Sequence, residues 1–353
     1  MTGLTMAARR PWLLLVPLAL DLLLWLAPRL SIAGLVQRFW RGWETLVRAT
    51  YAPGQLDVMA DMLKTLQEGM TMLGAQVNLL DVLAGSWLGP PSAIAVAQTT
   101  RLNFISELVL APVGLVPAPA RLAAAPWQSV AIEVRSLPVA LFLVVAFWLI
   151  AQVVAALWLR WLAAGLPRPR PLPGAGEAAG ADAANGVAQV AQLIGFCLFL
   201  GVILFVLRLP LGAAIALLLL SNSALAGLIF ALVEGATLWI TLWLLLSLYF
   251  TSEGLLFERQ PVWRSMLQGA AMLRGNVTAT LGLVGLINLL LVGFRAVWGI
   301  IGQTPAGGLL AIVGNAYLAT AMVLAVFVHY GALREQWAVA LEKQQAQKSQ
   351  AEK

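Results

Sequence analysis

The sequence predicts an all-α protein of the polytopic membrane class, with about six transmembrane helices and further amphipathic helices at the membrane surface. Two features of its composition support this: 61% of the 353 residues are hydrophobic and only 11% are charged. The mean hydropathy is also high, at +0.86. A soluble domain has about 25% charged residues and roughly half apolar ones. The composition therefore favours a chain built for lipid.

The charge pattern argues against a nucleic-acid partner. The formal net charge is +6, but the lysines and arginines are scattered between apolar runs, as in membrane proteins whose basic residues set their orientation. A nucleic-acid-binding protein gathers such residues on one soluble face. The single cysteine, Cys197, excludes an intramolecular disulfide.

Residues 1–28 are expected to hold the first transmembrane helix, with the N-terminus inside. Arg9 and Arg10 precede the apolar run 11–28, whose roughly 18 residues give about 27 Å, enough for a short span. A cleaved signal peptide is the alternative. Pro17 and Asp21 are awkward in the apolar part of such a peptide, so we favour an uncleaved span.

Residues 29–137 are more polar and nearly neutral, and predict an extracytoplasmic helical region that lies on the membrane. Apolar residues recur at three- and four-residue steps over 35–47 and 56–73, which is typical of amphipathic helices. A third helix is expected over 93–110. So few charges favour contact with the membrane surface. We expect any protein partner to bind through this region.

The remainder of the chain divides at changes in composition. Residues 138–164 predict the second span, 165–186 a flexible cytoplasmic Pro/Gly/Ala linker, 187–335 a four-helix membrane core, and 336–353 a polar cytoplasmic tail. We expect core spans at 187–207, 224–250, 277–301 and 309–330. Residues 211–220 are interpreted as a short outer-leaflet or re-entrant helix; a full span through 211–227 is the alternative.

A connector over 252–276 interrupts the core and is too polar to sit within a bilayer. Its helix is expected to begin after Pro261, since proline fits the first turn, and to end with Gly275 in a left-handed cap. We expect one apolar face, which includes Trp263 and Leu267, and an opposite polar face with Ser265 and Gln268. This helix is predicted to lie on the cytoplasmic surface.

Six spans place both termini in the cytoplasm. Most arginines of the short loops then fall on the cytoplasmic side, as the positive-inside rule requires. We therefore predict a multi-pass protein of the cytoplasmic cell membrane.

Residues 187–334 carry an order of short motifs that resembles a known membrane domain. The motifs are Glu253-Gly254, Arg264-Ser265, Arg274-Gly275-Asn276 and the ending 330–334, YGALR. The order is similar to that of the polytopic membrane domain fused to some bacterial glycerophosphodiester phosphodiesterases, and to its stand-alone relatives. The catalytic barrel of those enzymes needs a soluble α/β region of about 250 residues, for which this chain has no place. The resemblance therefore implies the membrane fold without the hydrolase activity.

No residue set predicts catalysis, a metal site or a cofactor. The only histidine, His329, has no cysteine, aspartate or second histidine at a readable spacing, and an interfacial structural role is the expectation. Glu253 and Glu258 are five residues apart on a segment expected to be irregular, which is a weak signal for an acidic catalytic pair. We do not expect an enzyme.

Two groups of charged residues are candidate sites. Asp21 and Glu234 lie within apolar runs, where ionisable groups cost roughly 2.5–3.5 kcal/mol and often mark a functional path; Arg295 is a candidate partner. A structural role as interhelical contacts is the alternative. The second group, a candidate contact for anionic lipid, is the connector arginines Arg259, Arg264 and Arg274.

The expected function is a non-catalytic scaffold or partner subunit that organises lipid or protein at the membrane. A transporter or exporter component for a small or lipid-like substrate, using Glu234, is the alternative. It would be expected to show paired broken helices, of which we find one, over 211–227.

Overall fold

The computed structural model describes residues 3–51, 60, 63–64, 66–71, 78–84, 131–167, 184–221, 224–258 and 260–351. Almost all secondary structure in these ranges is helical, which confirms the all-α class. The expected helix at 93–110 lies outside the described residues. The elements are α1 (Gly3–Arg9), η1 (Pro11–Leu14), α2 (Leu15–Leu26), β1 (Arg29–Ser31), α3 (Ala33–Thr50), η2 (Leu79–Ala84), β2 (Ala131–Glu133), α6 (Leu137–Ala164), α7 (Ala184–Ser221), α8 (Ala224–Ser247), α9 (Thr251–Glu258), α10 (Val262–Gly275), α11 (Val277–Ile301) and α12 (Pro305–Ala351).

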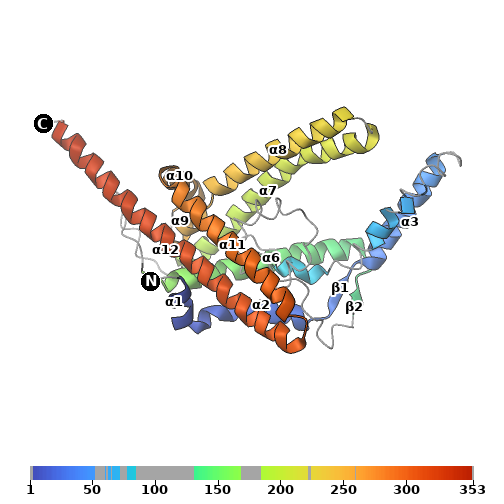
Figure 1. Cartoon of the computed structure of the whole chain (residues 1–353), viewed down its shortest axis with the longest axis horizontal. Helices are drawn as coiled ribbons and strands as arrows, with labels where there is room; N and C mark the ends of the chain where they lie inside the picture. Colours follow the sequence, from blue (N-terminus) through green and yellow to red (C-terminus); the bar gives the residue numbers. More distant parts are fainter. Residues whose placement is uncertain are drawn as a thin grey trace.

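The long helices run between two ends of the molecule (Figure 1). The N-terminus, the start of α7, the short helices α9 and α10, and the C-terminal part of α12 lie toward one end. The opposite end holds the two strands, α3 and the turn that joins α7 to α8. Successive long helices therefore alternate in direction, and the connector and both chain ends gather on one side.

The apolar helix at the expected first span begins after a break at Arg10. Arg10 leaves helical geometry (φ −133°, ψ 67°), because a residue that precedes proline is pushed out of the α region. Pro11 then opens a new helical segment, so the first apolar helix covers only Pro11–Leu26. The residues before it form α1, which packs closely on α12. Gly3 allows this approach, since a Cβ there would clash with the backbone of Ala321.

Helix α6 covers the second predicted span and begins one residue before its expected start. Helix α7 differs from the prediction, because it continues through Pro210 to Ser221 as one helix, with no separate helix at 211–220. Pro210 removes one backbone hydrogen bond. The leucine- and alanine-rich sequence after it favours helix, and a helix satisfies its remaining backbone groups internally.

The connector forms two helices, and α10 turns part of its apolar face outward while it buries part of its polar face. In α10 the buried residues include Ser265 and Gly269, whereas Trp263 is 65% exposed and Leu267 is 55% exposed. Trp263 and Leu267 therefore point away from the bundle, whereas Met272 and Leu273 are buried. The predicted left-handed cap is also wrong: Gly275 is helical, and Asn276 follows it with φ −140°.

Two short strands, which the sequence analysis did not predict, close the region between α2 and α6. Strands β1 and β2 pair in parallel, Arg29 with Ala131 and Ser31 with Glu133. Asn78 joins them, since its Oδ1 accepts a hydrogen bond from Leu30 N at 2.9 Å. The chain therefore leaves α2 and returns to α6 at the same place.

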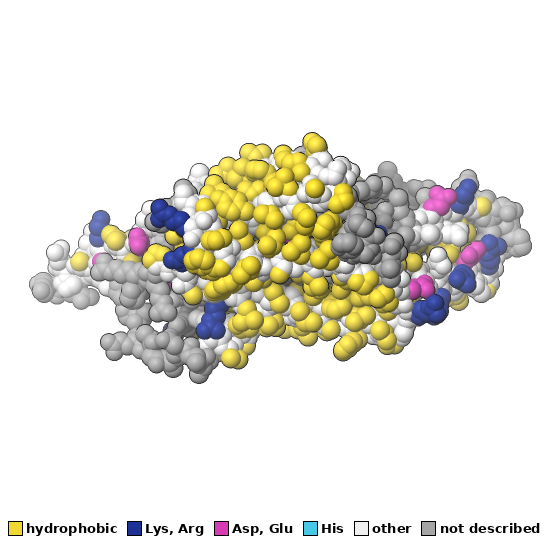
Figure 2. Space-filling view, turned by 90° about the horizontal axis from the view of Figure 1, so that it is seen from below, with side chains coloured by type: hydrophobic (Ala, Val, Ile, Leu, Met, Phe, Trp, Pro, Cys, Tyr) yellow, Lys and Arg dark blue, Asp and Glu magenta, His cyan; other side chains and the backbone are white. Residues whose placement is uncertain are grey.

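Three helical segments of the described chain are long and apolar enough to cross a membrane: Leu137–Ala164, Gly186–Ile203 and Pro305–Gln347. A fourth arises if Val262–Gly275 and Val277–Ile287, bent by 98°, form one broken span. Figure 2 shows a broad apolar surface over the middle of the molecule, with basic side chains toward both ends. Soluble monomers rarely expose so large an apolar area, so the surface indicates membrane association.

Candidate functional site

The connector helices α9 and α10 approach each other closely through small residues. A Cβ placed on Gly254 of α9 would lie 3.2 Å from the Cβ and Oγ of Ser265 on α10. A Cβ on Gly269 would lie 3.4 Å from the backbone of Phe250, which precedes α9. The absence of side chains at these two glycines brings the polar residues of the connector against the end of the bundle.

At this contact the carboxylate of Glu258 joins α9, α10 and α12. Its Oε1 accepts a hydrogen bond from the hydroxyl of Tyr330 at 2.6 Å, and the Nε of Arg334 pairs with the same oxygen. The amide Nε2 of Gln268 lies 3.0 Å from Oε1 and 2.8 Å from Oε2, and Gln260 Nε2 lies 2.8 Å from Oε2. Both carboxylate oxygens are therefore occupied by donors from the same chain.

The charges of this cluster are almost fully buried. The side chains of Arg334 and Glu258 are 2% and 7% exposed. Two buried charges of opposite sign are tolerated when they are paired and further hydrogen-bonded, and both conditions hold for Glu258. Tyr330 and Arg334 are four residues apart, so they lie on one face of α12.

A second carboxyl group lies one turn earlier on α9. Glu253 is 4% exposed, and this burial raises its pKa from the usual 4.5 to about 7. A hydrogen bond that Ser252 Oγ donates to Oε2 at 2.8 Å opposes the increase. Near neutral pH, Glu253 therefore exchanges between its protonated and ionised forms, unlike an exposed glutamate.

The hydroxyl groups near the cluster are not arranged as a nucleophile beside its base. Ser265 Oγ and Thr251 Oγ1 are buried and make no hydrogen bond to any described residue. The Nε2 of His329 is also without a partner in the described part of the chain, and its ring packs 6.1 Å from that of Phe250. A catalytic nucleophile is commonly hydrogen-bonded to its base, and no such bond joins these three groups in the described residues. Within the same residues, no group of three or more His, Cys, Asp or Glu side chains has the geometry of a metal site.

The structure separates the residues of the predicted intramembrane site. Asp21 on α2 is fully buried and accepts a hydrogen bond from Asn315 Nδ2 of α12 at 3.3 Å. Glu234 is exposed on α8. The side chain of Arg295 lies outside the described part of the structure. Asp21 therefore makes a helix–helix contact of the kind predicted as the structural alternative.

The predicted lipid-contact arginines lie on the outward face of α10. Arg264 and Arg274 are exposed, alongside Trp263 and Leu267. Arg259 lies outside the described residues. A helix that presents arginine beside tryptophan and leucine has the composition of a membrane-surface helix.

No family model, no curated protein and no solved structure matches this chain. The resemblance to the phosphodiesterase membrane domain therefore stays a prediction. Several of its motif residues nevertheless meet in space: Gly254 touches Ser265, and Tyr330 and Arg334 hold Glu258.

Sequence reasoning missed Glu258 and Gln268 as site residues. The sequence did contain one signal for Gln268. It lies three residues after Ser265 and three before the apolar Ala271, on the polar face of a helix whose other face is apolar. Glu258, shortly before this helix, is a possible acceptor for Gln268. Tyr330 and Arg334, four residues apart on the last span, are possible donors to the same carboxylate. Only the fold brings the three elements together.

Proposed function

We propose that this chain is a multi-pass protein of the cytoplasmic membrane that acts as a non-catalytic scaffold or partner subunit. The carrying observation is the closed hydrogen-bonding of Glu258: both its oxygens are used to join α9, α10 and α12. A reaction centre or transport site keeps polar groups free for its substrate. The side chains that bond to Glu258, those of Gln268, Tyr330 and Arg334, instead fix the connector against the bundle.

The proposal includes six membrane crossings, by α2, α6, α7, α8, α11 and α12, with both termini in the cytoplasm. The alternating directions of these helices support it (Figure 1). So does the gathering of Arg9, Arg10, Arg264 and Arg274 at one end, because basic residues favour the cytoplasmic side. A relation to the membrane domain of glycerophosphodiester phosphodiesterases is part of the same proposal. The close approach of Gly254 to Ser265, and of Tyr330 and Arg334 to Glu258, supports it.

Partner binding is assigned to the region that starts at β1 and returns at β2. Helix α3 extends from the bundle at this end (Figure 1) and exposes Phe39 and Leu46, 65% and 67% accessible. These residues are seven apart, so they share one helix face. Exposed large apolar side chains on one face are typical of a protein-binding helix.

The orientation can be tested with single cysteines, because the native Cys197 is buried. A membrane-impermeant thiol reagent added to intact cells should label cysteine at Arg41 and spare cysteine at Arg264 until the membrane is opened. The reverse pattern, or labelling of both in intact cells, would exclude the proposed topology.

The scaffold role is tested by cross-linking in cells followed by native mass spectrometry of the full-length protein. The expected result is a partner of defined mass in fixed stoichiometry, lost when Phe39 and Leu46 are both replaced by serine and retained in the control Arg41→Gln. Recovery of the bare protein with a retained small molecule would reject the scaffold and favour a carrier. Exposure of Glu234 on α8 gives the carrier no additional support.

A further inference from the structure

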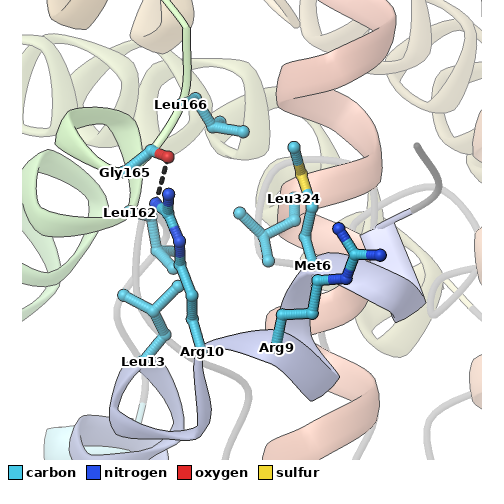
Figure 3. Close-up of a pocket in the computed structure, with 8 residues that line it drawn as sticks. All are labelled: Met6, Arg9, Arg10, Leu13, Leu162, Gly165, Leu166 and Leu324. Carbon is cyan, nitrogen blue, oxygen red and sulfur yellow. Dashed lines mark hydrogen bonds between the residues drawn. The ribbon is translucent and has the colours of Figure 1, made fainter.

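A cavity of about 130 Å³ lies where α1, η1, the end of α6 and the middle of α12 meet. Its walls are apolar apart from two guanidinium groups at its rim (Figure 3). The lining residues are Met6, Arg9, Arg10, Leu13, Leu162, Gly165, Leu166 and Leu324. It is separate from the Glu258 cluster and from the outward face of α10.

Arg9 and Arg10 precede the bend at Pro11 and line opposite sides of this cavity, with the guanidinium of Arg10 toward Gly165 and that of Arg9 beside Met6 (Figure 3). Arg10 Nη1 donates a hydrogen bond to the carbonyl oxygen of Gly165, at the end of α6. Gly165 permits the contact, since a Cβ there would lie 2.6 Å from Arg10 Nη1. A guanidinium carries five N–H donors, so Arg10 keeps donors for a second acceptor. Within the described part of the chain, neither Arg9 nor Arg10 pairs with a carboxylate.

The cavity lies beside the ends of two apolar helices, where a membrane crossed by these helices would have its headgroups. Two apolar segments end beside it: Pro11–Leu26 begins one residue after Arg10, and Leu137–Ala164 ends one residue before Gly165. Trp12 is 47% exposed next to it, and tryptophan favours the headgroup level. A water molecule occupies about 30 Å³ in the liquid. The cavity, at about 130 Å³, is several times larger and accommodates a short length of hydrocarbon.

We propose that this cavity is a binding site for an anionic phospholipid. The headgroup phosphate is held by Arg9 and Arg10, and the adjoining methylene groups of an acyl chain lie against Met6, Leu13 and Leu324. Arginine suits this role because its planar fork matches the oxygens of a phosphate. The site requires a membrane at this end of the molecule and is independent of the scaffold role.

The first test compares lipids on the unmodified full-length protein. Phosphatidylglycerol, phosphatidylcholine or inorganic phosphate is added in mild detergent, and bound mass and thermal stability are measured. The expected result is retention of phosphatidylglycerol and a higher melting temperature with it than with phosphatidylcholine. Equal effects of the two lipids would overturn the proposal, and so would an equal effect of phosphate alone.

The second test uses variants whose folding is checked by gel filtration and melting temperature. Arg9→Gln and Arg10→Gln should each weaken phosphatidylglycerol binding about fivefold, the effect of one arginine near an anionic surface. Arg41→Gln, the same charge change at the other end of the molecule, is the control and should bind as wild type. Met6→Phe, which narrows the cavity without changing charge, should also weaken binding. Wild-type affinity in both arginine variants, or in Met6→Phe, would reject the site.

Discussion

Replacement of Glu258 by glutamine should destabilise the protein by about 3–5 kcal/mol, the cost of removing one partner of a buried ion pair. The size follows from burial: the Arg334 side chain is 2% exposed, so its charge cannot be solvated by water once the carboxylate is lost. Tyr330 also loses an ionised acceptor at 2.6 Å. Arg334→Gln should cost a similar amount, because it leaves the Glu258 carboxylate buried without its cation.

A double-mutant cycle separates this pair from its surroundings. With both charges removed, the loss in Glu258→Gln/Arg334→Gln should be smaller than the sum of the single losses by at least about 1 kcal/mol. The exposed pair Glu44–Arg48, with side chains 30% and 65% exposed, is a matched control. Its cycle should give only about 0.3–0.5 kcal/mol.

The free energy of unfolding can be measured by titration with sodium dodecyl sulfate in mixed micelles, followed by the fluorescence of the 14 tryptophans. Losses below about 1 kcal/mol in both single variants, or additive losses in the double variant, would refute the reasoning. The Glu258 cluster would then not be what holds the connector to the bundle.

Three further predictions follow from buried groups elsewhere. Burial raises the folded-state pKa of Glu253 from 4.5 to about 7, so the free energy of unfolding should fall by up to about 3 kcal/mol as pH rises from about 4.5 to 7. Glu253→Gln should remove this decline. An unchanged pH profile of the variant in unfolding titrations would contradict the assignment. Gly314→Ala should cost about 1–3 kcal/mol by overpacking, since its Cβ would lie 2.7 Å from an indole carbon of α11. Gly293→Ala, with open space around it, should be neutral or stabilising, and equal melting temperatures for the two variants would disprove the close contact. Asn315→Leu should cost about 1.5–3 kcal/mol by removing a donor to the buried Asp21, whereas Asn315→Gln should recover part of the loss; no loss in the leucine variant would show that the hydrogen bond contributes nothing.

The helices were predictable because their signals are local. Periodic apolar residues predicted α3, and an uninterrupted apolar run predicted α6 almost to its ends. The break before Pro11 coincides with the expected start of the first span, whereas α1 was missed because its packing on α12 joins residues far apart in the sequence. The pairing of β1 with β2 was missed because three-residue strands about 100 residues apart leave no periodic signal.

The polar site was less predictable, because it depends on which face of α10 packs. Sequence reasoning assumes that the apolar face of an amphipathic helix is buried against protein. At a membrane surface the same face can turn to lipid, and Trp263 and Leu267 do face outward. The inner face is then free for Ser265, Gly269 and Gln268. Glu258 gains its partners from this reversal, which no spacing in the sequence records.

The reversed face also explains why a costly buried ion pair suits the connector. If α10 packed on the bundle through Trp263 and Leu267, apolar burial alone would hold it there. With those side chains turned outward, the inner face presents Ser265, Gln268 and Gly269, and Met272 and Leu273 are the large apolar side chains that it buries. Gln268 and Arg334 both donate to the carboxylate of Glu258, and these directional hydrogen bonds hold α10 at a fixed orientation. Because Arg334 lies on α12, which continues as one helix to Ala351, the same contacts fix the direction of the C-terminal extension relative to the surface helix.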